Sequence, residues 1–203
     1  MEVSSLRHIV IALLIFQLST YVKSDSATKA SPINTNADYI KTSCNVTLYP
    51  KLCYRTLSYY ASKIKTDPVL LANTALNVSV MATKSTFRLT RKMSRLHGLS
   101  PREAAAMQDC VEVVGDSVYE LQRSMGDMGH VNGTDFERII SDIKTWVSAA
   151  LTDDDTCMDG LNELVVNGYV KIIVRKHIVR IAHLTSNALA IICTYASSFV
   201  NLH

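Results

Sequence analysis

Apolar side chains recur every three or four residues through most of this chain, and no segment keeps an alternation with a period of two. A three-and-four spacing places the apolar residues on one face of an α-helix. The pattern predicts four long amphipathic helices, over residues 69–97, 101–126, 134–153 and roughly 167–200. The predicted buried stripe of the first helix is Leu71, Ala75, Val78, Ala82, Leu89, Met93 and Leu96, and that of the third is Phe136, Ile140, Ile143, Val147 and Ala150.

Three of the helix starts are marked by candidate capping residues. Ser100-Pro-Arg-Glu103 has the form of a capping box with proline at the first helical position, and Thr134-Asp-Phe-Glu137 repeats the box. Asp67 before Pro68 is the third candidate cap. The links between the helices are short, so neighbouring helices are expected to be antiparallel. The sequence therefore predicts an all-α fold, an up-down-up-down four-helix bundle.

The segment before the bundle is predicted to form two shorter helices bent at Tyr49-Pro50. We expect one domain over residues 37–200, in which 37–66 is a helical hairpin and 67–200 is the bundle. Residues 25–36 are expected to be a flexible N-terminus of the mature chain.

The first 24 residues have the pattern of a secretory signal peptide. Arg7 and His8 precede the apolar run Ile9–Leu18, which is too short to span a bilayer. Val22 and Ser24 supply the small residues of a cleavage site, so cleavage is expected after Ser24. A second uncharged run, Leu184–Leu202, contains many serine, threonine and asparagine residues and is interpreted as a buried bundle helix. No membrane partner is expected.

Export to an oxidising compartment favours disulfide bonds among this chain's five cysteines. Cys44 and Cys53 flank a short turn, and Cys110 and Cys157 lie in two of the predicted helices. Sequence alone does not choose among the possible pairings. Cys193, in an apolar run, is interpreted as a buried free thiol, with an intermolecular bridge as the alternative.

Three glycosylation sequons follow the predicted cleavage site, at Asn45, Asn77 and Asn132. Together with the signal peptide they are typical of a secreted glycoprotein. The formal net charge of +3 gives no general attraction to nucleic acid or anionic membranes.

Catalytic, cofactor and metal motifs are not found in the sequence. It has no H-E-x-x-H, no G-x-S-x-G and no phosphate-binding loop, so we expect no enzyme activity, no cofactor and no metal. The acidic run Asp153–Gly160 does not match a calcium loop. Thr156 or Asp159 is interpreted there as a helix N-cap.

Two charged helix faces are candidate binding surfaces. The basic row Lys84, Arg88, Arg91 and Arg95 is interpreted as a solvated helix face, with a polyanionic polysaccharide as the alternative ligand. The second predicted bundle helix carries a polar face opposite its apolar stripe, which comprises Asp109, Glu112, Asp116, Tyr119, Glu120 and Arg123. A tyrosine among hydrogen-bonding groups is a suitable anchor for a protein partner.

Four motifs resemble those of the plant invertase and pectin methylesterase inhibitors. The segment Ile40–Cys53 resembles the opening motif of this family, and Gln108-Asp109-Cys110 resembles its third-cysteine helix. The segment Trp146–Gly160 resembles its fourth-cysteine motif, and Leu184–Ala190 is similar to its closing helix. The resemblance implies disulfides Cys44–Cys53 and Cys110–Cys157 and a helical hairpin on a four-helix bundle.

The resemblance also implies a function. Invertase inhibitors typically carry Pro-Lys-Phe before the fourth-cysteine segment, and residues 125–142 contain no such motif. We therefore expect a free-standing, secreted inhibitor of pectin methylesterase in the apoplast or cell wall, which binds non-covalently over the pectin-binding cleft and regulates pectin de-esterification. An invertase inhibitor and a non-inhibitory polysaccharide-binding or ligand-like protein are the alternatives. The candidate partner-binding residues are Glu112, Asp116, Tyr119, Asp135, Ser141 and Ser148.

Overall fold

The computed structural model describes residues 32–131, 134–163 and 168–200. The predicted signal peptide and the sequon asparagine Asn132 lie outside the described residues. Most of the expected flexible segment 25–36 also lies outside them, and a helix begins within that segment at Pro32.

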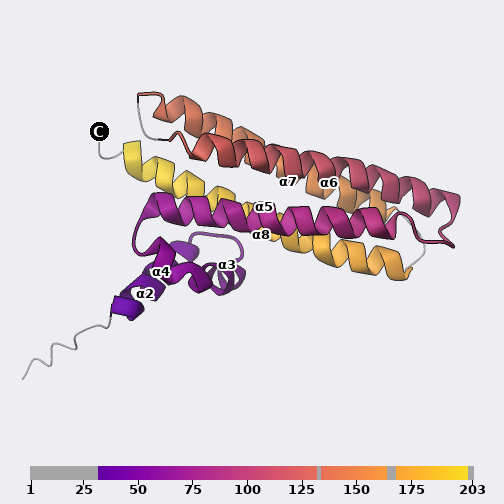
Figure 1. Cartoon of the computed structure of the whole chain (residues 1–203), viewed down its shortest axis with the longest axis horizontal. Helices are drawn as coiled ribbons and strands as arrows, with labels where there is room; N and C mark the ends of the chain where they lie inside the picture. Colours follow the sequence, from indigo (N-terminus) through magenta and orange to yellow (C-terminus); the bar gives the residue numbers. More distant parts are fainter. Residues whose placement is uncertain (1–31, 132–133, 164–167, 201–203) are drawn as a thin grey trace, which may run out of the picture. The chain divides into compact units, whose positions relative to one another are not determined.

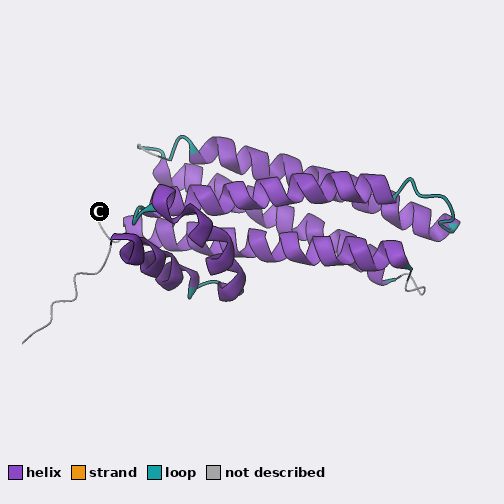
Figure 2. Cartoon of the chain, turned by 60° about the horizontal axis from the view of Figure 1, so that its bottom comes forward, coloured by secondary structure: helices purple, strands orange, loops and turns teal. Residues whose placement is uncertain are grey.

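The described residues form helices and contain no strand (Figures 1 and 2), which confirms the all-α prediction. The elements are α2 (Pro32–Cys44), α3 (Pro50–Leu57), the 3-10 helix η1 (Ser58–Tyr60), α4 (Ala61–Ile64), α5 (Pro68–Met93), α6 (Pro101–Met128), α7 (Phe136–Asn162) and α8 (Tyr169–Val200).

Helices α5 to α8 form the predicted up-down-up-down bundle. Each runs antiparallel to the next, α6 packs along α7, and α5 packs along α8 (Figure 1). The shorter helices α2, α3 and α4 pack at the end of the bundle where α5 begins and α8 finishes.

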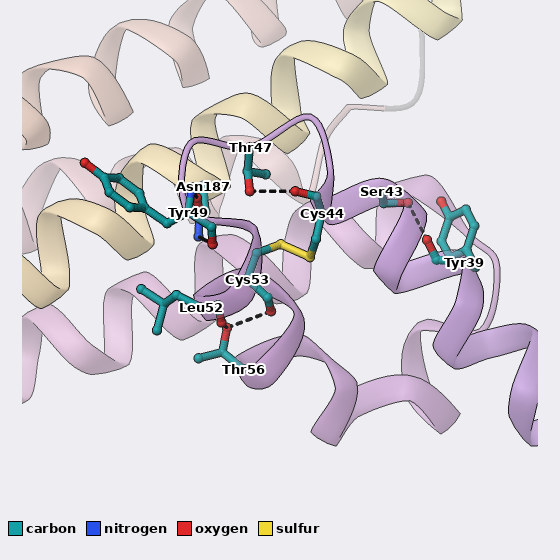
Figure 3. Close-up of a disulfide and its surroundings, with 9 residues drawn as sticks. All are labelled: Tyr39, Ser43, Cys44, Thr47, Tyr49, Leu52, Cys53, Thr56 and Asn187. Carbon is teal, nitrogen blue, oxygen red and sulfur yellow. Dashed lines mark hydrogen bonds between the residues drawn. A yellow bond between two sulfur atoms is a disulfide. The ribbon is translucent and has the colours of Figure 1, made fainter.

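The N-terminal hairpin is attached to α8 through Tyr49 and Asn187 (Figure 3). The backbone N–H of Tyr49 donates to Asn187 Oδ1 at 3.1 Å, and Asn187 Nδ2 donates to the Tyr49 carbonyl oxygen at 3.1 Å. The Tyr49 ring also stacks on His183, with the ring centroids 3.6 Å apart. One asparagine therefore satisfies both backbone groups of the residue at which the hairpin bends.

The disulfides join Cys44 to Cys53, between α2 and α3 (Figure 3), and Cys110 to Cys157, between α6 and α7. These are the two pairings that the family resemblance implied. Cys193 is a half-buried free thiol on α8.

Two of the three predicted caps are present. Asp67 Oδ1 accepts hydrogen bonds from the N–H groups of Val69 and Leu70, at 2.8 and 3.0 Å, and Ser100 with Glu103 forms the full capping box. The box predicted at Thr134 is wrong, because α7 begins at Phe136 with Asp135 at the N-cap position and no side-chain cap bond.

Helix α7 continues past residue 153 to Asn162, so the prediction of a helix N-cap at Thr156 or Asp159 is wrong. The buried stripe of α7 extends through Asp154, Cys157 and Leu161 at the same three-and-four spacing. An aspartate at a core position interrupted the hydrophobic pattern and concealed this last part of the helix.

The second half of α5 also differs from the predicted stripe. Thr83, Thr86 and Thr90 are buried there, whereas Leu96 is 40% exposed. The Thr90 hydroxyl donates to the Thr86 carbonyl oxygen at 3.0 Å, which satisfies a buried hydroxyl within the helix. Threonine can occupy a core position in this way, and a purely apolar pattern does not detect it.

A polar layer divides the bundle core. The apolar cluster near the hairpin reaches Val80 on α5, Leu121 on α6, Ala150 on α7 and Ala188 on α8. The second cluster, at the other end, comprises Met107, Cys110, Val114, Cys157, Leu161, Val174, Ile178 and Ile181. Between them each helix contributes one fully buried polar residue, and this polar layer comprises Thr83, Ser117, Asp154 and Thr185.

Among the described residues one helix, α8, is long and apolar enough to cross a membrane, and half of its apolar window is buried inside the bundle. Its buried side chains include Val174, Ile178 and Ile192. Burial of this kind is expected of a bundle helix.

Candidate partner-binding surface

The outer face of α6 presents three of the predicted partner-binding residues in one row. Glu112, Asp116 and Tyr119 are all exposed, and Tyr119 leaves 57% of its surface open to solvent. Steps of four and three residues align their side chains along the helix. The structure therefore brings these three residues together as the sequence predicted.

A cation–π contact extends this row onto α7. The guanidinium carbon of Arg123 lies 5.2 Å from the ring centroid of the half-buried Trp146. Tyrosine, tryptophan and arginine are the residue types that most often dominate protein–protein affinity. Trp146 was not among the predicted site residues. Its position directly before the core residue Val147 does indicate that it lies on the flank of α7, beside the core.

Carboxylates crowd between α6 and α7 beside this contact. Burial, together with the nearby charges of Asp153 and Asp116, raises the pKa of Glu120 to about 7. Burial likewise raises the pKa of Asp153. Because two neighbouring carboxylates resist full ionisation, Glu120 and Asp153 together gain negative charge as the pH rises.

A further carboxylate, Asp154, is fully buried in the polar layer. Ser117 Oγ donates to Asp154 Oδ1 at 3.2 Å, while Asp154 Oδ2 has no hydrogen-bond partner among the described residues. Burial is the main reason that the pKa of Asp154 is raised to about 8. The side chain is therefore protonated in mildly acidic fluid.

The other three predicted residues do not join the α6 row. Asp135 is exposed at the start of α7 and pairs with Arg138 at 3.1 Å, and Arg138 also reaches Asp142 at 3.3 Å. Ser141 borders a hollow of about 430 Å³ between α7 and α8. Ser148, seven residues after Ser141, shares that flank of α7.

Of the two sequons within the described residues, Asn45 is exposed and Asn77 is half-buried on α5. The amide nitrogen of Asn77 lies 3.8 Å from the sulfur of Met81. Glycosylation at both positions stays a prediction.

The support beneath the α6–α7 surface is rigid. The Cys110–Cys157 disulfide joins the two helices, and the hydrogen bond between Ser117 and Asp154 joins them again in the polar layer. A helix pair tied at two levels presents its exposed side chains with little freedom to rearrange, which lowers the entropy lost on binding.

Comparison with known proteins identifies close relatives. The family model for the plant invertase/pectin methylesterase inhibitor matches residues 38–191. Pectinesterase inhibitor 10 of Arabidopsis thaliana is 51% identical over 82% of this chain and 54% of its own length, so the match spans about half of that relative.

Two further relatives match along most of both chains. The 21 kDa protein of Daucus carota is 42% identical over 85% of this chain and 89% of its own. Pectinesterase inhibitor 9 of Arabidopsis thaliana is 41% identical over 92% of this chain and 93% of its own.

A solved structure has the same fold. The crystal structure of a mutant form of a pectin methylesterase inhibitor from Arabidopsis superposes with a TM-score of 0.60 at 23% identity, over 76% of this chain and 95% of that one.

Proposed function

The chain belongs to the plant invertase/pectin methylesterase inhibitor family, and on that premise we propose that it is a secreted, non-catalytic inhibitor of pectin methylesterase. The observation that carries the proposal is the similarity to a pectinesterase inhibitor, 41% identical, over nine-tenths of both chains. Blocking the pectin-binding cleft of the esterase would slow the de-esterification of cell-wall pectin.

We place the inhibitory surface on α6 and α7. Glu112, Asp116 and Tyr119 form its row on α6, and Arg123 and Trp146 extend it to α7. Two aromatic rings and a guanidinium group offer anchoring area, and the surrounding carboxylates offer specific polar contacts. Asp135, Ser141 and Ser148 stay predicted contacts on α7 outside this row, with Ser141 and Ser148 on the flank that faces α8.

The proposal also includes the route to the target. Residues 1–24 act as a signal peptide, the hairpin and the bundle over 37–200 form the inhibitor domain, and the protein acts in the apoplast or cell wall. The two disulfides support this, since such bonds persist in oxidising compartments.

The experiment that tests the function compares two enzymes. The mature protein is incubated with pectin methylesterase and separately with cell-wall invertase at mildly acidic pH, and activity is measured together with the mass of any complex. We expect a one-to-one complex with the esterase and loss of its activity, with invertase unaffected. Full esterase activity at excess inhibitor, or inhibition of invertase alone, would contradict the proposal.

A charge reversal locates the surface. Asp116→Lys should weaken esterase inhibition about tenfold or more, because it reverses a charge at the centre of the row. Asp38→Lys makes the same change at an exposed position on α2 and serves as the control. Equal inhibition by the two variants, with equal melting temperatures, would remove the α6 row from the proposed interface.

A further inference from the structure

Charge is divided unequally between the two helix pairs of the bundle. Helices α5 and α8 contain no aspartate or glutamate. The acidic residues of the bundle helices all lie on the other pair, with Glu103, Asp109, Glu112, Asp116, Glu120 and Asp127 on α6 and Glu137, Asp142, Asp153, Asp154, Asp155 and Asp159 on α7. Because α5 packs along α8 and α6 along α7 (Figure 1), the bundle has a cationic side and an anionic side.

The cations of α5 form a row along one face of the helix. Lys84, Arg88 and Arg91 follow one another on α5 at steps of four and three residues, and Arg95 follows in the turn after the helix ends at Met93. All three arginines are exposed. At 1.5 Å per residue, Lys84 and Arg91 lie roughly 10 Å apart along the helix axis. With Lys92, the three arginines enclose an open hollow of about 520 Å³.

No carboxylate neutralises this row within the described part of the chain. Both ion pairs found there belong to Arg138, on α7. Cations in the last turn of a helix interact favourably with its dipole, which accounts for Arg91 and Lys92. The dipole does not account for Lys84 and Arg88, because its effect falls off within the last turn.

Helix α8 adds a second group of cations at the same end of the bundle. Arg175, Lys176 and Arg180 are exposed in its first half. Since α8 runs antiparallel to α5, its first half lies beside the second half of α5, where the row is (Figure 1). The name cationic surface is kept below for the row with Lys92, namely Lys84, Arg88, Arg91, Lys92 and Arg95, and the α8 cations add positive charge at the same end of the bundle.

We propose that the cationic surface binds a linear polysaccharide that carries repeated carboxylates, namely de-esterified pectin. A guanidinium group matches a carboxylate in shape and donates two hydrogen bonds to it, and a row of such groups suits a linear polyanion. The choice of polymer rests on the proposed function, because the esterase converts the methyl esters of pectin into carboxylates. The anionic α6–α7 surface stays free for the enzyme, so the inhibitor is concentrated where the esterase has already acted.

The test measures polymer binding without any esterase, so it can fail independently of inhibition. The mature protein is titrated with polygalacturonate and with highly methyl-esterified pectin, which has the same backbone and few charges. We expect binding to polygalacturonate that weakens strongly between about 0.02 M and about 0.15 M salt, since screening acts on exposed charges. Binding to the esterified polymer should be at least about tenfold weaker, because its carboxylates are blocked.

A matched pair of variants locates the surface. Arg88→Gln, Arg91→Gln and Arg95→Gln together remove three charges from the α5 row. Lys41→Gln, Lys51→Gln and Arg55→Gln remove three charges from exposed positions in the N-terminal hairpin. The α5 variant should lose about tenfold or more in affinity for polygalacturonate, and the hairpin variant less than about twofold. Both should keep the melting temperature and esterase inhibition of the unmodified protein.

Four results would overturn the proposal. They are no binding to polygalacturonate at low salt, equal losses in the two variants, equal affinity for both polymers, and tighter binding to vesicles that contain phosphatidylserine. Light scattering tests one other occupant, a second copy of this chain whose anionic side docks on the cationic surface. A dimer that the α5 variant dissociates would assign the surface to self-association instead.

Discussion

The α6–α7 pair and the α5–α8 pair have the same architecture, two long antiparallel helices, but they treat charge in opposite ways. Between α6 and α7, carboxylates approach one another, and Asp154 is fully enclosed. On α5 and α8 the arginine cations are exposed to solvent. Like charges are therefore close together and partly buried between α6 and α7, and spread over exposed positions on α5 and α8. Only the carboxylates between α6 and α7 change protonation near physiological pH.

This difference assigns separate properties to the two pairs. The α6–α7 pair should carry most of the pH sensitivity and the contact with a protein partner. The α5–α8 pair should carry the salt sensitivity and the contact with a polymer, because its charges are exposed and screened by ions. Variants that shift the pH sensitivity to α5–α8, or the salt sensitivity to α6–α7, would contradict this assignment.

The largest expected effect is the pH dependence of stability caused by Asp154. Its pKa of about 8 in the folded protein exceeds the ordinary value near 3.8, so the folded state holds a proton that the unfolded chain releases. The stabilisation of the folded state by protonated Asp154 is therefore greatest below about pH 4. The free energy of unfolding falls by roughly 3 to 6 kcal/mol as the pH rises from there to about 8. Urea unfolding across this range measures the slope.

Asp154→Asn should flatten that slope, because an amide does not titrate, while Asp155→Asn at the neighbouring exposed position should reduce it only slightly, because burial of Asp154 outweighs the nearby charge of Asp155 as the cause of the raised pKa. A slope that survives in Asp154→Asn would show that the pH dependence arises elsewhere. The same slope lost in Asp155→Asn would show that net charge, rather than burial, controls it.

The next effect in size concerns inhibition. Tyr119→Ala should weaken esterase inhibition about tenfold, since an exposed tyrosine in the centre of an interface contributes both apolar area and a hydrogen bond. Tyr59→Ala, at a site in the hairpin that is 84% exposed, is the matched control and should retain full inhibition. Inhibition constants measured for both variants separate the α6 row from the rest of the surface.

The sequence predicted the architecture because most core positions are apolar and regularly spaced. The stripe of α7 from Phe136 to Ala150 is buried as predicted. The predictions were wrong where a polar residue occupies the core, as with Asp154 and the threonines of α5. Thr90 donates to the preceding turn and Asp154 Oδ1 accepts from Ser117 on α6, whereas Thr83 Oγ1 and Asp154 Oδ2 have no partner among the described residues. A pattern of apolar residues along one helix does not include such contacts.

The candidate site shows the same limit: a pattern along one helix predicts what lies on that helix but not what lies opposite it. Glu112, Asp116 and Tyr119 lie on a single helix, so their shared face could be predicted from their spacing. The contact between Arg123 and Trp146 joins two helices, and it depends on their relative rotation. Sequence periodicity does not fix that rotation, so this part of the surface came only from the structure.

The weakest of the predicted effects concerns Glu120, a half-buried carboxylate of α6. The pKa of Glu120 is raised to about 7, so its ionisation lowers stability as the pH rises from about 4.5 to about 7. Glu120→Gln should therefore raise the free energy of unfolding at pH 8 by about 0.5 kcal/mol, a value reduced for solvent screening, and leave it unchanged at pH 4. Glu112→Gln removes the same charge from an exposed position on α6 and is the control. If both variants gain equally at pH 8, a general reduction of negative charge explains the gain; if only Glu120→Gln gains, the crowding of carboxylates between α6 and α7 is its cause.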